Sequence, residues 1–250
     1  PYEYDIASDT ITFADKFNHI FEGESVIEHP SENMLKMGLV SYDTQSAIEE
    51  LFYLAKAGTE YHSTEFKLNT KNGGFQWYFS TFSTIYDEEG NALRVVGLLR
   101  NIHAQKVEQQ KLLIRAETDQ MTGLYNKATT ESKIQASLRE LNGNSYEVLM
   151  LVDIDDFKKI NDTFGHLKGD DVIIDIARTL QEYKGDYGIA GRLGGDEFCA
   201  MLPGNAGDGQ RIREQVRREC DGFNSDSDKA YYVELSIGYH VIRCGSDLVI

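Results

Sequence analysis

The feature that most constrains this chain is a largely apolar segment, residues 189–202, with the glycine pair Gly194-Gly195 and two acids at its centre. Gly194 and Gly195 tolerate the positive φ angles that a two-residue β-hairpin turn requires. Because the flanking residues are apolar enough for the centre of a sheet, the segment predicts a strand, a Gly194-Gly195 turn and a second strand. Asp196 and Glu197 follow directly, so two carboxylates are expected at the tip of the hairpin.

A second acidic group ends another apolar run. Residues 148–152 are all apolar, which is typical of a strand buried on both faces, and Asp153, Asp155 and Asp156 follow them. Carboxylates gathered from two strand ends repel one another, and a divalent cation would relieve the repulsion. Oxygen ligands favour Mg²⁺ or Mn²⁺ over zinc. The alternative is two unrelated acidic loops on an acidic protein.

Helix and strand patterns alternate from residue 119 onward. Apolar residues at 157, 160 and 164 predict a short helix on the sheet. Those at 172, 173, 176, 177 and 180 predict a further helix after a break at residues 165–170. We therefore expect an α/β or mixed α+β domain with a central sheet surrounded by helices.

The first hundred residues have a different pattern. Residues 2–6 and 10–13 predict a hairpin, residues 46–57 a helix, and residues 61–68, 75–86 and 92–101 a three-stranded meander. This order indicates a small α+β domain with an antiparallel sheet and flanking helices. Residues 104–118 are polar and lack Pro and Gly, which predicts a linker helix. Val107, Ile114 and Met121 lie seven apart and give a weak coiled-coil signal, to which a solvated helix is the alternative.

Composition excludes several functional classes. The chain has 25 Lys and Arg against 41 Asp and Glu, a net charge of −16, whereas proteins that coat nucleic acid or anionic membranes need a positive surface. Three cysteines without paired spacing fit a reducing cytosol. We expect no nucleic-acid partner, no membrane contact in this segment and a cytoplasmic location. Because the chain begins at Pro1, it is also read as the cytoplasmic part of a longer, membrane-anchored protein.

The sequence GRLGGDEF at residues 191–198 resembles the signature of the GGDEF family, the diguanylate cyclases. Three further segments resemble motifs of that family, in the same order. They are DQMTGLYNK at 119–127, VDIDDFKKINDTFGHLKGDDVI at 152–173 and LSIGYHVI at 235–242. The resemblance covers residues 119–250 and implies the nucleotidyl-cyclase-like GGDEF fold.

The resemblance implies an enzyme that condenses two GTP molecules into cyclic di-GMP and releases two pyrophosphates, across a homodimer whose domains each hold one GTP. Positioning and charge neutralisation dominate phosphoryl transfer, and Mg²⁺ (or Mn²⁺) would supply the latter. The implied metal ligands are Asp153, Ile154 through its carbonyl, Asp196 and Glu197, and the implied catalytic residues are Asp196 as the candidate base, Asp153 and Glu197. The implied substrate-binding residues are Asn161 and Asp170 for guanine, His166 near the nucleotide, and Asp156, Phe157 and Lys158 for the phosphates. Arg192 is interpreted either as a phosphate contact or as a cation at a strand edge.

Two departures from the family pattern limit these expectations. Residues 185–188 read GDYG where many members carry an Arg-x-x-Asp site for inhibition by product. The family's domain also continues into a basic helix after its last strand, whereas this sequence ends at Ile250. We therefore expect the C-terminal part of the domain to be missing.

Residues 1–103 resemble a PAS sensor domain, chiefly through residues 66–102. This implies a PAS-regulated cyclase, with residues 104–118 joining the sensor to a cyclase domain at 119–250. The PAS ligand is left open: this half has no cysteine to hold a flavin, and a module without cofactor is favoured over haem binding by one of its histidines. The alternatives are a catalytically weak GGDEF domain that binds GTP or docks proteins in signalling, and a purely structural PAS dimer.

Overall fold

The computed structural model describes residues 1–250 except 15, 22, 142–144, 225–231 and 244–250. The chain divides into two compact units, Pro1–Lys111 and Leu112–Ile250, and the division falls inside the predicted linker helix. Within the described residues, no helix has both the length and the apolar character needed to cross a bilayer.

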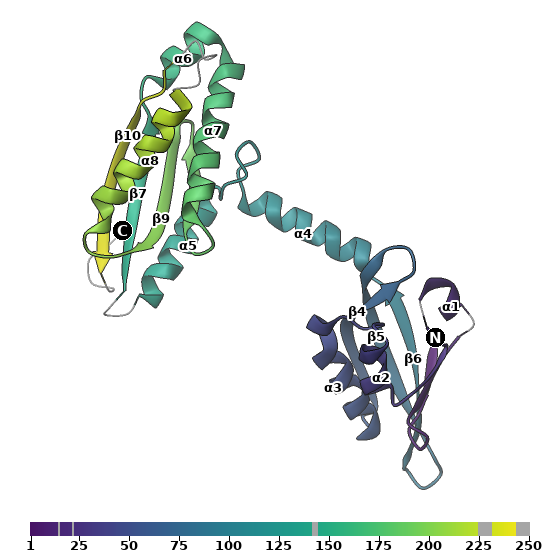
Figure 1. The fold of residues 1–250 in the computed structure, drawn as a ribbon. Coiled ribbons are helices and arrows are strands. Elements are labelled where there is room, and N and C mark those ends of the chain that lie inside the picture. Colours follow the sequence, from purple (N-terminus) through teal and green to yellow (C-terminus); the bar gives the residue numbers. More distant parts are fainter. Residues whose placement is uncertain (15, 22, 142–144, 225–231, 244–250) are drawn as a thin grey trace. The chain divides into compact units, whose positions relative to one another are not determined.

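Unit 1 is built on a six-stranded antiparallel sheet with the strand order β3-β2-β1-β6-β5-β4 (Figure 1). Its elements are β1 (Tyr2–Asp5), β2 (Thr10–Phe13), α1 (Phe17–Ile20), β3 (Val26–Glu28), α2 (Pro30–Lys36), the 3₁₀ helix η1 (Tyr42–Thr44), α3 (Gln45–Lys56), β4 (Tyr61–Thr70), β5 (Gly74–Tyr86) and β6 (Ala92–Asn101). The predicted hairpin, helix and meander are all present. The short elements α1, β3, α2 and η1 were not predicted.

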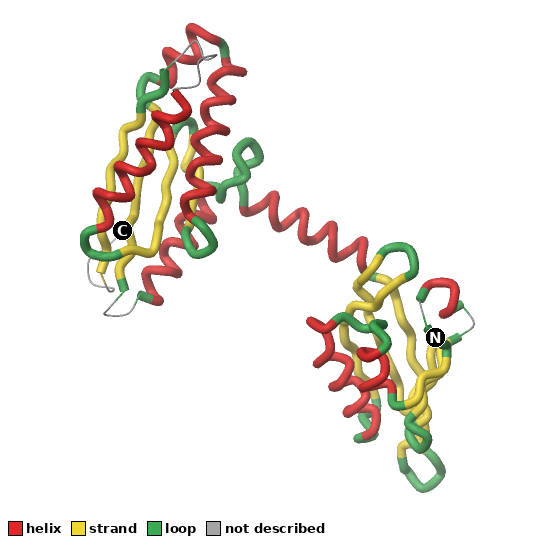
Figure 2. The backbone as a smooth tube through the Cα atoms, in the orientation of Figure 1, coloured by secondary structure: helices red, strands yellow, loops and turns green. Residues whose placement is uncertain are grey.

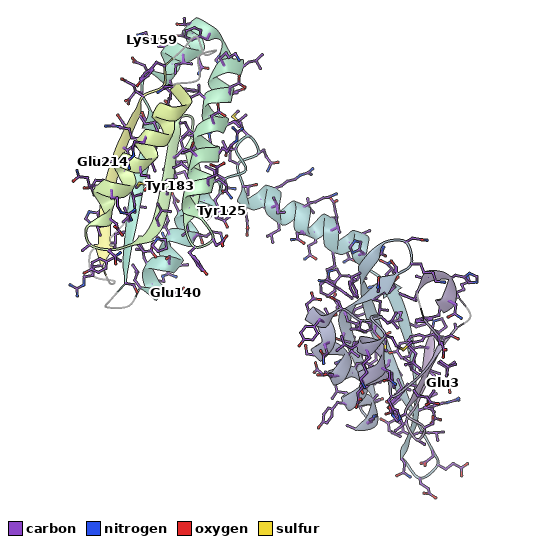
Figure 3. All side chains as sticks on the ribbon, in the orientation of Figure 1. Glu3, Tyr125, Glu140, Lys159, Tyr183 and Glu214 are labelled. Atoms are coloured by element: carbon purple, nitrogen blue, oxygen red, sulfur yellow. The ribbon has the colours of Figure 1, made fainter. Side chains whose placement is uncertain are left out.

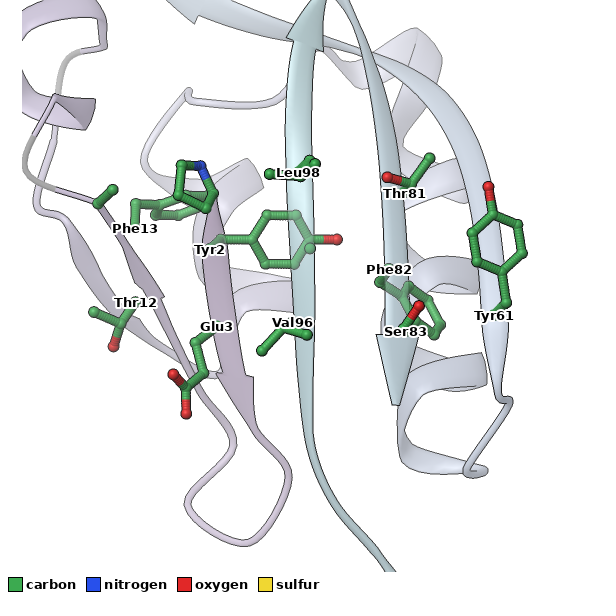
Figure 4. A pocket seen from close by; sticks show the side chains of 13 residues that line it. Tyr2, Glu3, Thr12, Phe13, Tyr61, Thr81, Phe82, Ser83, Val96 and Leu98 are labelled. Carbon is green, nitrogen blue, oxygen red and sulfur yellow. The ribbon is translucent and has the colours of Figure 1, made fainter. Parts of the chain in front are cut away.

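The core of unit 1 lies on one face of this sheet, where α1, α2 and α3 pack. Alternate strand residues point toward the helices, so Tyr4, Leu68 and Phe82 are buried together with Phe52 of α3. The opposite face is open. A shallow cavity of about 540 Å³ lies on it, and its lining includes Tyr61, Val96 and Leu98 (Figure 4).

The helix α4 (His103–Glu117) follows β6 and confirms the helix predicted for residues 104–118. Lys106 pairs with Glu65 and lies over the ring of Trp77, which anchors the start of α4 to the sheet of unit 1. Every residue of α4 is at least partly exposed, and Leu112, Leu113 and Ile114 are each more than half exposed.

Unit 2 contains a four-stranded sheet with the order β10-β7-β9-β8. Figure 2 shows its strands in yellow with the helices in red beside them. Its elements are α5 (Lys127–Glu140), β7 (Tyr146–Ile154), α6 (Phe157–Phe164), α7 (His166–Lys184), β8 (Ile189–Gly194), β9 (Glu197–Gly204), α8 (Asp208–Asn224) and β10 (Leu235–Arg243). All three neighbouring pairs are antiparallel, so the unit is mixed α+β rather than α/β with a parallel sheet.

Helices cover the two faces of this sheet unequally. The helices α7 and α8 pack on one face, where Val148, Met150 and Val152 are buried. On the other face α5 packs over β8 and β9, and leaves Leu151 54% exposed beside β10. The expectation that residues 148–152 are buried on both faces is therefore wrong, because one helix is too narrow to cover four strands.

Two boundaries near the motifs also differ from the prediction. The hairpin turn is Gly195-Asp196, since Gly194 still pairs with Glu197, and a register shift lies between Arg192 and Gly194. The break after α6 is the single residue Gly165, whose φ is +85°, and α7 begins directly at His166. Phe164 is more exposed than the predicted helix face requires.

Candidate functional site

Three acidic residues lie at one end of the sheet of unit 2. In β7, Asp153 lies opposite Glu197 of β9 on one side and Ser236 of β10 on the other. Asp196 occupies the second position of the adjoining turn. Burial raises the pKa of Asp153, and the charges of Asp196, Glu197 and Asp155 raise it further. The two acidic segments thus share one site.

The oxygen atoms at this site are of the kind that binds a hard cation. Carboxylate and carbonyl oxygens are the ligands of Mg²⁺, and a cation would offset the repulsion that raises the pKa of Asp153. As they stand, however, no three His, Cys, Asp or Glu side chains among the described residues converge into a group that holds a metal. The side chain of Ile154 is apolar and buried at the end of β7, so this residue could bind a cation only through its backbone carbonyl oxygen. The metal assignment therefore stays a prediction.

The segment between β7 and α6 turns sharply at Asp156. This residue has a positive φ of 54°, and its carbonyl accepts hydrogen bonds from the amides of Lys159 and Ile160. Phe157 begins α6 and packs partly against the core, while Lys158 is exposed. A helix N-terminus beside an ammonium group suits phosphate oxygens. Lys159 lies on the exposed side of α6 (Figure 3).

The predicted guanine contacts lie where α6 meets α7. A methyl group on Gly169 would overlap Oδ1 of Asn161 and lie 3.2 Å from Cζ of Phe157, so the two helices approach closely at this glycine. Asp170 is the next residue of α7 and is half-buried. His166 is the first residue of α7 and is exposed, so it belongs to the helix and not to a loop.

A cavity of about 490 Å³ lies beside the acidic side chains. Its lining comprises Leu151, Val152, Asp153, Leu193, Glu197, Phe198, Arg217, Ser236, Ile237 and Gly238. Part of this surface is the region of the sheet that α5 leaves uncovered. The cavity places open space directly against two of the predicted metal ligands.

Arg192 has a role that the sequence patterns did not reveal. Its guanidinium donates hydrogen bonds to the carbonyl of Gly195 from Nε (3.0 Å) and Nη2 (2.7 Å), and Nη1 lies 3.2 Å from Oδ1 of Asp119. The residue therefore contacts the turn that carries Asp196. Asp119 belongs to the motif at residues 119–127, but no local pattern in the sequence predicts that it pairs with Arg192.

Comparison with known protein families adds an independent finding. Residues 116–248 match the family described as diguanylate cyclase, GGDEF domain. The chain belongs to the GGDEF family. The matched residues contain every acidic and substrate-contact candidate described above, and they account for more than half of the chain.

Curated relatives match part of this chain and a smaller part of their own length. The chain is 34% identical over 132 residues to the probable diguanylate cyclase DgcF of Escherichia coli (strain K12), which covers 52% of this chain and 41% of that protein. It is 39% identical over 110 residues to the response regulator PleD of Caulobacter vibrioides (strain NA1000 / CB15N), covering 43% of this chain and 24% of that protein. The chain thus spans less than half the length of these relatives.

A solved structure supports the GGDEF fold. The coiled coil and GGDEF domain of DgcB from Caulobacter crescentus, in complex with c-di-GMP, superposes with a TM-score of 0.52 at 24% identity. The superposition covers 58% of this chain and 79% of that one.

Proposed function

We propose that this protein is a diguanylate cyclase that condenses two GTP molecules into cyclic di-GMP and releases two pyrophosphates. The placement of Asp153, Asp196 and Glu197 at one end of the sheet, in a chain of the GGDEF family, supports this proposal. The N-terminus of α6 follows β7 within three residues and offers amides for the phosphates.

Each candidate residue has a task in this reaction. Asp196 takes the proton of the attacking 3′-hydroxyl, and its place on the turn leaves it accessible to that proton. The backbone of Asp156 and Phe157 and the ammonium of Lys158 hold the phosphates. The guanine is bound by Asn161 and Asp170, with His166 near the nucleotide. Bound Mg²⁺, held by Asp153, Asp196, Glu197 and the carbonyl of Ile154, would neutralise charge on the triphosphate.

The chemistry of the product requires two domains. Each GTP supplies a 3′-hydroxyl to the α-phosphate of the other, and one GGDEF domain is proposed to hold one GTP. The protein therefore acts as a homodimer whose two sites face each other.

Unit 1 is proposed to be a PAS-like sensor that regulates the cyclase. The order of its elements, a hairpin followed by helices and a three-stranded meander, supports this assignment. A GTP substrate and an acidic composition fit a cytoplasmic location. The chain would be there either as a free protein or as the cytoplasmic part of a longer, membrane-anchored protein.

One observation favours a second candidate function. Among the described residues, the acidic side chains are not gathered into a ready group of metal ligands. A GGDEF domain of weak activity that binds GTP or docks a partner would fit that arrangement.

The deciding experiment incubates the full-length protein with GTP and Mg²⁺ and identifies the product by mass spectrometry. We expect cyclic di-GMP from the unmodified protein, and a kcat lowered by about 10²–10⁴-fold in Asp196→Asn, because a positioned proton acceptor contributes that much. Asp186→Asn, an exposed acid of the GDYG turn, is the matched control and should leave kcat unchanged. Binding of GTP without product would select the second candidate.

A further inference from the structure

The turn that carries Asp196 has little packing of its own. Gly194 and Gly195 have φ angles of +151° and +54°, and a methyl group built on either would meet none of the described atoms within 4 Å. The register shift between Arg192 and Gly194 also interrupts the regular ladder just before the turn. Two unpacked glycines next to an irregular strand leave the peptide before Asp196 free to move unless another group holds it.

The guanidinium of Arg192 holds that peptide. Nε and Nη2 both donate to the carbonyl of Gly195, at 3.0 and 2.7 Å, and this carbonyl belongs to the peptide bond that leads into Asp196. Nη1 donates to both carboxylate oxygens of Asp119, at 3.2 and 3.4 Å, and lies 3.4 Å from Sδ of Met121. The side chain is only 12% exposed. All three guanidinium nitrogens are therefore engaged within the protein, which uses the planar fork that arginine has and lysine lacks.

Asp119 is itself fixed to the sheet. Its Oδ1 accepts hydrogen bonds from the amide (2.9 Å) and hydroxyl (2.8 Å) of Thr122. The segment is bound to β8, since Tyr125 donates its amide to Ala190 and accepts from the amide of Arg192. Burial opposes ionisation of Asp119, but the hydrogen bonds from Thr122 and the charge of Arg192 outweigh it and lower the pKa of Asp119. The ionised carboxylate of Asp119 is thus held in a fixed position beside the guanidinium of Arg192.

From these contacts we infer that Arg192, oriented by Asp119, is a positioning residue that fixes the turn carrying Asp196. The inference rests on the proposed cyclase function and resolves the two earlier interpretations of Arg192. Arg192 lies on the edge strand β8, but its guanidinium is bound to the turn and to Asp119 and is not directed at a phosphate or at solvent. The pair acts on the group that takes the proton and not on the guanine contacts of α6 and α7.

The test compares Arg192→Lys with Arg178→Lys. The first substitution keeps the positive charge but removes the planar guanidinium that contacts Gly195 and Asp119 at the same time. Arg178 pairs with Asp175 at 2.9 Å on the exposed side of α7, and is the matched control. We expect Arg192→Lys to lower kcat by about 10- to 100-fold, since misplacing a reacting group by about 1 Å costs up to 10²-fold. The KM for GTP should stay nearly unchanged, which a general loss of structure would not produce. Arg178→Lys should match the unmodified protein in both parameters.

A double-mutant cycle tests the role of Asp119. Asp119→Asn should lower kcat in the same direction, and Asp119→Asn combined with Arg192→Lys should be no slower than Arg192→Lys alone, because both act through one contact. Additive losses would show that Asp119 acts separately and would overturn its assigned role.

Amide hydrogen exchange at residues 194–197 separates failure of this inference from failure of the proposed function. Exchange there should accelerate in Arg192→Lys and not in Arg178→Lys, whether or not the protein turns over GTP. If product forms and Arg192→Lys keeps full kcat, the inference is wrong while the cyclase assignment stands. If no product forms from the unmodified protein, the cyclase proposal fails, and unchanged exchange in Arg192→Lys would overturn the positioning role as well.

Discussion

At Gly169 the absence of a side chain lets α6 and α7 approach so closely that Oδ1 of Asn161 occupies the space of a β-carbon. Gly169→Ala should push Asn161 out of this place. Because a hydrogen bond contributes about 0.5–1.5 kcal/mol, we expect the KM for GTP to rise by about twofold to tenfold. Steady-state kinetics over a range of GTP concentrations would measure the change.

The control for this substitution is Gly207→Ala. Gly207 has open space around it and a φ outside the left-handed region, so a methyl group there should leave KM unchanged. An unchanged KM in Gly169→Ala would mean that Asn161 does not contact the nucleotide from its present position.

Asp9 of unit 1 is an acid whose stabilising effect depends on pH. Tyr4 donates to its Oδ1 at 2.6 Å, while His29 and Lys56 lie 2.9 and 3.0 Å from its Oδ2. Burial alone would raise the pKa of Asp9, but these hydrogen bonds and the charge of Lys56 outweigh it and lower the pKa to about 2. A lowered pKa in the folded state stabilises the fold above the unfolded pKa of about 3.9, and this effect is lost as the pH falls toward 2.

Asp9→Asn should therefore destabilise unit 1 near neutral pH, by an amount that shrinks as the pH falls from 4 to 2. Asn suits the φ of +50° at this position, so the substitution removes the charge without adding backbone strain. Urea unfolding at several pH values would measure the difference, and Trp77, the single tryptophan of the chain, reports on unit 1 selectively. A difference that stays constant down to pH 2 would contradict the role of the ionised carboxylate.

On the scale of elements, the close packing of α5 against β8 depends on Gly191 in β8. A methyl group on Gly191 would overlap the hydroxyl and Cβ of Thr130, which is fully buried in α5. Gly191→Ala should force α5 away from β8 and destabilise unit 2 by about 1–3 kcal/mol, the usual cost of overpacking a core. Calorimetry would record a lowered transition for unit 2, while the Trp77 fluorescence transition of unit 1 and the control Gly207→Ala stay unchanged. A unit 2 transition equal to that of the unmodified protein would contradict the close packing.

Elements with long, regular patterns could be predicted from the sequence, and short ones could not. The strands β4, β5 and β6 each have ten or more residues and alternate clearly, whereas β3 has three residues and α1 four. Strand direction in unit 2 was not predictable, because an apolar run looks the same in parallel and antiparallel sheets. The turn was placed one residue early because the irregularity after Arg192 depends on pairing with β9 and not on local sequence.

The candidate site could be predicted in part for a similar reason. The acids at 153, 196 and 197 stand in recognisable motifs, and their meeting follows from the pairing of β7 with β9. The contact between Asp119 and Arg192 joins residues 73 positions apart, and depends on how residues 119–125 lie along β8. No periodicity encodes such a contact.

For the whole molecule, the proposed reaction predicts that activity depends on protein concentration. Two GTP-bound domains must meet, so cyclic di-GMP formed per chain should fall on dilution below the dimer dissociation constant, while GTP binding per chain stays constant. Initial rates over a wide range of protein concentrations, with calorimetric GTP titration alongside, would measure both. A constant rate per chain at every concentration would show that one chain suffices.

The position of β10 in the sheet has a consequence for how the protein is made. Asp153 lies on β7, whose second neighbour β10 comes much later in the chain. The hydroxyl of Ser236 in β10 donates a hydrogen bond to Asp155, in the turn that follows β7, and the two residues are 81 positions apart. At a ribosome speed of about 5–20 residues per second, some 4 to 16 seconds pass before that neighbour has been synthesised. During this interval one side of β7 is an unpaired edge, which invites pairing with other nascent chains. The strand that carries the acids is thus the last part of the sheet to be closed during translation.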